Sequence, residues 1–303
     1  MLVDVERGWN PRHLDLAVHD IRLAFGEPLT PNEGHGTSVL GIACAAEHGP
    51  DFTPPRAGCT GVAPRVARIE LVAIDEEGTN LVEALGVALD RPAGDVVLVE
   101  VQSRLPPPHG DLLAPVEAHP DLYDLIASAV GAGVIVIEVG GNGTTGPDDV
   151  GGLTPALDMD RVAVDIAGNG PVPIFDRAYR DSGAIIVSAA SNDPLPRRLP
   201  YAPHGRRIDL YTRAEGVFCP DSERGEVTRY RSDFSGTSAA AAVVAGAALC
   251  LQSRAVALGP PLDAWQIRDL LAHGGTPAAP GEAIGVMPNL AAAIAELDRR
   301  LRG

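Results

Sequence analysis

Phe234-Ser235-Gly236-Thr237-Ser238 runs directly into an apolar stretch, 239–252, that has scarcely a polar side chain. The stretch predicts a helix buried in the middle of a fold, because a helix that is apolar on all sides has no face suited to water. Ser238 would stand at the amino-terminal end of this helix, where unpaired backbone N–H groups and the helix dipole stabilise an anion. Its hydroxyl is therefore either a nucleophile or a helix cap, and this stretch alone favours neither.

Short apolar runs alternate with helical patterns along the rest of the chain, as expected for βαβ units that build a parallel sheet. Strands are predicted at 1–5, 66–74, 96–101, 134–139 and 184–190. Helices are predicted at 35–46, 81–89, 122–130, 239–252, 263–273 and 289–302. The predicted fold class is therefore α/β with a mainly parallel central sheet, and residues 1–303 are expected to form a single domain.

Composition limits the classes of partner. The chain has 24 basic and 40 acidic residues and a net charge of −16, which disfavours nucleic acid and anionic lipid and favours cationic peptides. We expect no membrane span, since no apolar run reaches about 18 residues. No signal peptide is recognisable, so the chain is expected to be either cytosolic or a mature domain or fragment. The cysteines lack metal-ligand spacing, and Cys59 and Cys219, in Gly/Pro-rich loops, leave a disulfide open.

A serine hydroxyl becomes a good nucleophile only when a base removes its proton and a carboxylate holds that base. The best candidate base is His35, because it opens the other apolar helix and is flanked by glycines in Gly34-His35-Gly36. The best candidate carboxylate is Asp4, which we place at the carboxyl end of the first strand, where catalytic groups of open parallel sheets gather. Asp15 and Asp20 are its rivals, and both look like ordinary surface or capping carboxylates.

The order Asp4, His35, Ser238 differs from the orders of α/β-hydrolases and chymotrypsin-like proteases. Three motifs stand in this order, at 4–16, in Gly34-His35-Gly36-Thr37 and in Gly236-Thr237-Ser238-Ala239-Ala240. On these motifs the chain resembles the subtilases, the subtilisin-like serine proteases, over nearly its whole length. The resemblance implies a three-layer α/β/α fold, here with a shortened amino-terminal portion. It also implies a serine endopeptidase that forms an acyl-enzyme on Ser238.

The strand at 134–139 leads into Gly140-Gly141-Asn142-Gly143, which resembles the oxyanion segment of the same family. By this resemblance, the Asn142 amide would donate a hydrogen bond to the developing oxyanion, together with the backbone N–H of Ser238. The alternative is an ordinary turn residue between glycines.

The segment 95–102 resembles the substrate-binding edge of the family, to which a peptide or protein substrate adds as a strand. The residues expected to contact substrate are Glu100, Val101, Gln102, Val139, Gly140 and Gly141. Glu100 and Glu138 both close apolar runs, so they either form a pocket for Arg or Lys beside the scissile bond or are partnered structural carboxylates. Both readings stay open.

Other functional classes also stay open. With three residues before Asp4, the chain could be an inert, peptide-binding form of the fold, or a protease dedicated to one precursor peptide. The sedolisin variant, with Glu as base, is disfavoured by His35 and Asn142. We expect no cofactor and no catalytic metal. Calcium is common in the family, but Asp15 alone does not make a site. The oligomeric state is left open.

Overall fold

The computed structural model describes residues 1–47, 58–110, 112–143, 155–166 and 168–302. Within these residues, nine strands form one sheet in the order β12-β13-β9-β8-β7-β4-β1-β3-β2, and the β12–β13 pair alone is antiparallel. The strands of this sheet are β1 Leu2–Glu6, β2 Ile21–Phe25, β3 Ile69–Ala73, β4 Val96–Val99, β7 Ile135–Val139, β8 Ile185–Ala190, β9 Leu210–Arg213, β12 Thr276–Pro277 and β13 Val286–Met287. Two antiparallel ribbons stand apart from it: β5 Gln102–Arg104 with β6 Leu113–Pro115, and β10 Val217–Pro220 with β11 Tyr230–Phe234.

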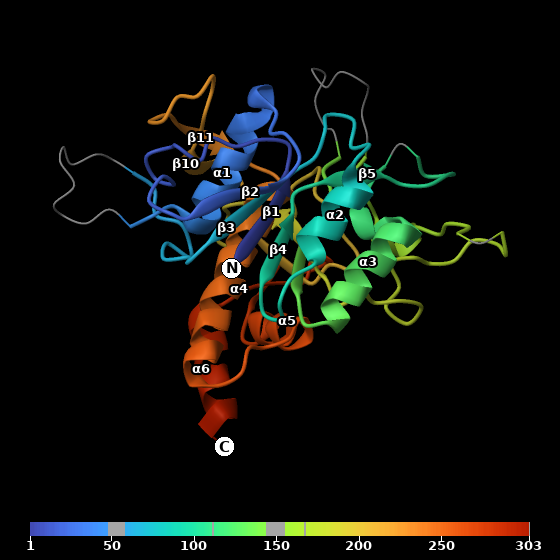
Figure 1. Cartoon of the computed structure of the whole chain (residues 1–303). Coiled ribbons are helices and arrows are strands. Elements are labelled where there is room, and N and C mark those ends of the chain that lie inside the picture. The colour runs from blue at the N-terminus through green and yellow to red at the C-terminus, as the bar shows by residue number, and fades with distance from the viewer. Residues whose placement is uncertain (48–57, 111, 144–154, 167, 303) are drawn as a thin grey trace.

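Helices cover both faces of this sheet. They are α1 Glu33–Cys44, α2 Leu81–Leu89, α3 Pro120–Gly131, α4 Thr237–Leu258, α5 Ala264–Ala272 and α6 Leu290–Arg302. Figure 1 shows α2 and α3 in front of the sheet and α4 behind it; α2 packs on β1 and β3, and α4 packs on β4, β7, β8 and β9. The predicted three-layer α/β/α class with a mainly parallel sheet is confirmed. The single domain stays a prediction.

The first strand lies inside the sheet. β1 pairs in parallel with β3 on one side and with β4 on the other, and all five of its residues are buried. Val5 is level with Val99 in the register, and the Glu100 N–H donates to the Val5 carbonyl at 3.1 Å. Glu6 and Glu100 therefore leave the sheet side by side at its carboxyl edge.

The two apolar helices predicted from the sequence pack against each other. Gly246 of α4 makes this close approach possible, because an added Cβ would lie 2.5 Å from the Val62 Cβ and 3.0 Å from the Ala43 carbonyl oxygen. By length and composition alone, α4 is apolar enough to cross a membrane. Such a helix was not predicted from the sequence, because only uninterrupted apolar runs were counted there. In the structure it packs against the sheet, α1 and α6 as a core helix.

Two of the sheet strands that the pattern missed, β2 and β9, lie at the edge or are poor in apolar residues. β2 is the last strand of the sheet, and its Leu23 is half-exposed while Arg22 faces solvent. β9 contains only two apolar residues, Leu210 and Tyr211. The four cysteines, including Cys59 and Cys219, are free thiols in the structure.

Candidate active site

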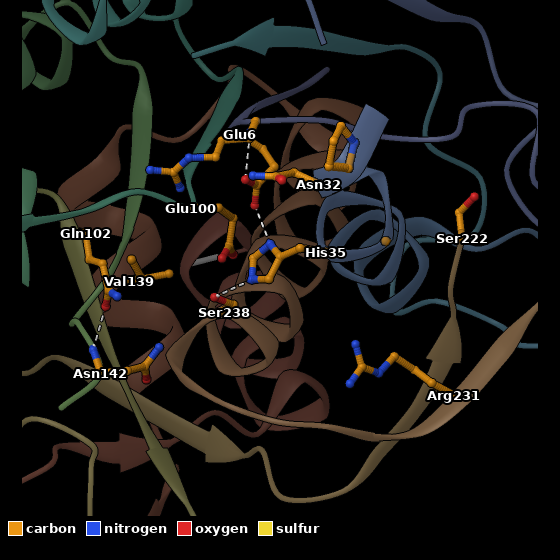
Figure 2. Close-up of a pocket in the computed structure, with 13 residues that line it drawn as sticks. Glu6, Asn32, His35, Glu100, Gln102, Val139, Asn142, Ser222, Arg231 and Ser238 are labelled. Carbon is orange, nitrogen blue, oxygen red and sulfur yellow. Dashed lines mark hydrogen bonds and ion pairs between the residues drawn. The ribbon is translucent and has the colours of Figure 1, made fainter. Parts of the chain in front are cut away.

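Three side chains from three elements meet at the carboxyl edge of the sheet (Figure 2). His35 comes from the first turn of α1, Ser238 from the first turn of α4, and Glu6 ends β1. The His35 Nε2 lies 3.2 Å from the Ser238 Oγ, and the His35 Nδ1 contacts the Glu6 Oε2. A hydroxyl on one imidazole nitrogen and a carboxylate on the other is the arrangement that activates a serine by general base catalysis.

The carboxylate beside His35 is Glu6 and not Asp4, which corrects the residue expected from the sequence. Asp4 is fully buried within β1, and its Oδ2 accepts a 2.7 Å hydrogen bond from the Trp9 indole. The strand continues for two residues beyond Asp4, so Glu6 lies on the same side of the strand but nearer the edge. The signal that would have found it is the position of Glu6 as the last residue of the strand.

The glycines around His35 let the chain segments approach one another. A Cβ on Gly36 would lie 2.3 Å from the Gly8 carbonyl oxygen, so the loop after β1 can touch α1 only at a glycine. A Cβ on Gly34 would similarly lie 2.8 Å from the Asp221 carboxylate. The contact with the loop after β1 brings the base within reach of Glu6.

The hydroxyl of Ser238 is not a helix cap. The N-cap of α4 is Gly236, whose φ of 109° suits a residue without a Cβ and which has no side chain to cap the helix. The Asn142 Oδ1 instead accepts from the Thr237 N–H at 3.0 Å and from its hydroxyl at 3.1 Å. These bonds fix the orientation of the Asn142 amide group, whose nitrogen lies beside Gly236 at the start of α4.

A cleft of about 480 Å³ opens over these residues. Three of the residues expected to contact substrate line it, namely Glu100, Gln102 and Val139, whereas Val101, Gly140 and Gly141 do not. The Asn142 N–H donates to the Gln102 side chain at 2.7 Å, which ties two walls of the cleft together. The cleft also includes Arg7, Asn32, Ser222 and Arg231, which the sequence did not single out.

Glu138 does not line the cleft, so the two glutamates do not form a common pocket for a basic residue. Glu138 is level with Val99 on the neighbouring strand, and Glu100 follows Val99, so the two glutamates project to opposite faces of the sheet. The Glu138 carboxylate accepts a hydrogen bond from the Glu117 N–H at 3.1 Å. Its position fits the alternative reading, a buried structural carboxylate.

The charges at the site shift the titration of its groups. Burial would by itself lower the pKa of His35, but the neighbouring Glu6 carboxylate outweighs burial and raises this pKa above its ordinary value. Burial raises the pKa of Asp4 to about 8, against the opposing effect of the Trp9 hydrogen bond. At neutral pH, therefore, Asp4 is largely neutral, whereas Glu6 is the group that favours a positive charge on His35.

Asp15, the one position at which the sequence raised calcium, is held by the protein itself. Its two carboxylate oxygens accept hydrogen bonds of 2.9 Å from the Tyr230 hydroxyl and the Cys59 N–H. Across the described residues, moreover, no three His, Cys, Asp or Glu side chains are grouped as metal ligands. The hydrogen bonds from Tyr230 and Cys59 thus account for the conformation of Asp15.

The chain is similar to known proteins in sequence and in fold. The subtilase family model matches residues 24–283, a range that includes His35, Asn142 and Ser238 but not Glu6. A search of curated proteins gave no match.

Solved structures share the fold at low sequence identity. The self-cleaved protease domain of PatA is 17% identical, with a TM-score of 0.67 over 99% of this chain and 97% of that one. The prenylagaramide maturation protease PagA is 20% identical, with a TM-score of 0.66 over 98% and 93%. Fervidolysin from Fervidobacterium pennivorans, a keratinolytic enzyme related to subtilisin, is 19% identical, with a TM-score of 0.64 over 97% of this chain and 42% of that one. With the family match extending over most of its length, the chain belongs to the subtilase family and is a serine-type peptidase.

Proposed function

We propose that the protein is a serine endopeptidase that hydrolyses peptide bonds through an acyl-enzyme on Ser238. The observation that carries the proposal is His35, which contacts Ser238 through Nε2 and Glu6 through Nδ1. In the first step the Ser238 Oγ attacks the scissile carbonyl while His35 takes the hydroxyl proton. His35 then gives this proton to the leaving amine, and water repeats the sequence on the acyl-enzyme.

Glu6 holds the proton of His35 on Nδ1, so that Nε2 is free to accept from Ser238. Its carboxylate also stabilises the imidazolium that forms once the serine proton has moved. The backbone N–H of Arg7 donates to the other Glu6 oxygen at 2.6 Å, which keeps the carboxylate in place. Glu6 therefore has the role that the sequence assigned to Asp4.

Asn142 and the backbone N–H of Ser238 stabilise the oxyanion of the tetrahedral intermediate. Support comes from the two bonds that Thr237 makes to the Asn142 Oδ1, because they orient the amide before substrate arrives. A preorganised donor needs no rearrangement as the negative charge develops.

The substrate is a peptide or protein in an extended conformation that lies along the cleft. Glu100, Gln102 and Val139 supply the surfaces that it meets, and the net charge of −16 attracts cationic segments over a longer range. The PagA structure is described as that of a maturation protease, and specialisation for one precursor peptide is compatible with the same chemistry.

Unfolded proteins and peptide libraries test the proposal. Incubation of the wild-type protein with a denatured protein should produce new amino termini inside the substrate chain, and Ser238→Ala should abolish them. Cleavage restricted to one precursor sequence would favour the dedicated processing protease. Folded wild-type protein that binds peptides but leaves them intact would favour the inert peptide-binding module and overturn the proposal.

A further inference from the structure

A second glutamate, which is not the acid in contact with His35, lies beside the nucleophile. Glu100 follows β4 and lines the cleft with Ser238, and Figure 2 shows its carboxyl group directed toward that serine. The side chain is buried, and neither carboxyl oxygen forms a hydrogen bond of ordinary length with the described residues. The Ser238 hydroxyl is nevertheless near enough to act on the Glu100 carboxyl group as a hydrogen-bonding neighbour. A buried acid without a partner is costly, so a group at this position needs either a proton or a ligand.

The groups that face Glu100 give it no free positive charge. β1 presents Asp4 and Glu6, which are both acids, and the His35 of α1 is already in contact with Glu6. From α4 the group that acts on Glu100 is the neutral hydroxyl of Ser238. A negative charge on Glu100 would therefore be added to a cluster of carboxyl groups.

The arginines that line the cleft have partners elsewhere. Arg7 donates to the Glu76 carbonyl at 3.2 Å, and Arg231 forms a 2.8 Å ion pair with Asp233. Burial raises the pKa of Glu100 well above its ordinary value, and the repulsion by Asp4 and Glu6 adds to this effect. The Ser238 hydroxyl favours the ionised form as a hydrogen-bonding neighbour, but its effect is smaller than that of burial and the two acids. Protonation is thus the least costly state of this carboxyl group.

We propose that Glu100 is a positioning residue that stays protonated at the working pH and donates a hydrogen bond to the Ser238 Oγ. A serine hydroxyl has one proton to donate and two lone pairs to accept with. When Glu100 is the donor, the proton of Ser238 is left to point at the His35 Nε2, which is the productive orientation. The inference rests on the proposed hydrolase function and adds a residue to it.

Loss of the Glu100 proton reverses this hydrogen bond. The carboxylate is then an acceptor, and it competes with the His35 Nε2 for the one proton of Ser238. The reactive orientation is depleted as the pH rises, although His35 itself is in its neutral, basic form. The structure thus places an alkaline limit on the reactivity of Ser238, separate from the acid limit set by His35.

The pH dependence of labelling by an uncharged fluorophosphonate isolates this effect from substrate binding. In the wild type the rate constant should rise with deprotonation of His35 and then fall by about tenfold per pH unit above the pKa of Glu100. Glu100→Gln keeps a donor but cannot ionise, so its profile should show the rise without the fall. Glu138→Gln is the matched control, because Glu138 is also a buried glutamate but faces the other side of the sheet, and its profile should keep both limits.

An alkaline fall that persists unchanged in Glu100→Gln would overturn the inference and leave the proposed function intact. An unchanged profile combined with a selective loss of cleavage after Arg or Lys would make Glu100 a cation-binding residue instead. Wild-type protein that is not labelled at any pH would overturn the proposed function as well.

A second measurement covers the case in which Glu100→Gln does not fold. In Glu138→Gln protein, carboxyl ¹³C NMR of labelled glutamates should show a carboxyl group that is still protonated at neutral pH and that titrates together with the alkaline fall in labelling. If every glutamate is ionised at neutral pH, Glu100 does not hold the proton and the inference is wrong.

Discussion

Replacement of Glu6 by glutamine tests which acid serves His35. The substitution keeps the size of the side chain and removes the negative charge that contacts the His35 Nδ1. A glutamine can also turn its NH₂ group toward Nδ1, which moves the imidazole proton to Nε2. The Nε2 would then donate to Ser238 and could no longer accept the serine proton.

The expected loss in kcat for Glu6→Gln is about 10⁴-fold, as for other triads whose carboxylate becomes an amide. At about 1.36 kcal/mol for each factor of ten, this corresponds to about 5.4 kcal/mol of transition-state stabilisation. The raised pKa of His35 should also fall, because the Glu6 carboxylate is the main group that raises it. His35 then stays neutral to lower pH, and the acid limit of the residual activity moves downward.

Asp4→Asn is the matched control. Because the pKa of Asp4 is about 8, its carboxyl group is largely neutral at pH 7, and an asparagine can still accept from the Trp9 indole. The assay is hydrolysis of a quenched fluorescent peptide over a range of pH. The result that would refute the reasoning is the reverse pattern, in which Glu6→Gln stays within about tenfold of wild type while Asp4→Asn loses most of the activity.

Three further predictions concern the oxyanion site, Asp4 and the helix pair. Asn142→Ala should lower kcat by about 10² to 10³-fold, the cost measured for such a donor in subtilisin, with little change in KM. An unchanged kcat with a KM raised by a similar factor would contradict the assigned role. The folded-state pKa of Asp4 is raised from 3.8 to about 8, so between these pH values the folded protein holds a proton that the unfolded chain has lost. The free energy of unfolding should therefore fall through this group as the pH rises from about 4 to about 8. Urea unfolding of Asp4→Asn should therefore show a smaller loss of stability across that interval, and an unchanged pH dependence would argue against the buried acid. Gly246→Ala should destabilise the fold by about 1–3 kcal/mol, measured by urea unfolding, because the new Cβ would meet Val62 and the Ala43 carbonyl; a neutral result would mean that α1 and α4 separate easily.

Much of the architecture could be predicted because its signal is local. The helix at 81–89 has the predicted bounds, and the strands 135–139 and 185–190 fall within one residue of the predicted bounds. Continuous runs of Val, Ile and Ala mark buried parallel strands and helices directly in the sequence. β2 and β9 carry too few apolar residues for such a signal, and their places in the sheet depend on neighbours far away in the chain.

The site was predictable in part for the same reason. His35 and Ser238 stand at the starts of apolar helices, so their convergence follows from the motifs. Glu6 was not among the candidates from the sequence, because the first strand was expected to end near Asp4, and strand ends are poorly defined by sequence. Likewise, the faces to which Glu100 and Glu138 project depend on the register between β4 and β7, which the sequence does not display.

The central claim is that Ser238 is the nucleophile activated by His35. Its most direct test is the mass of the protein after reaction with a fluorophosphonate, followed by mapping of the modified peptide. We predict one adduct per molecule, located on Ser238, and no adduct on Ser238→Ala or on His35→Ala. An adduct of the folded wild type on any other residue, or undiminished labelling of Ser238→Ala, would contradict the account.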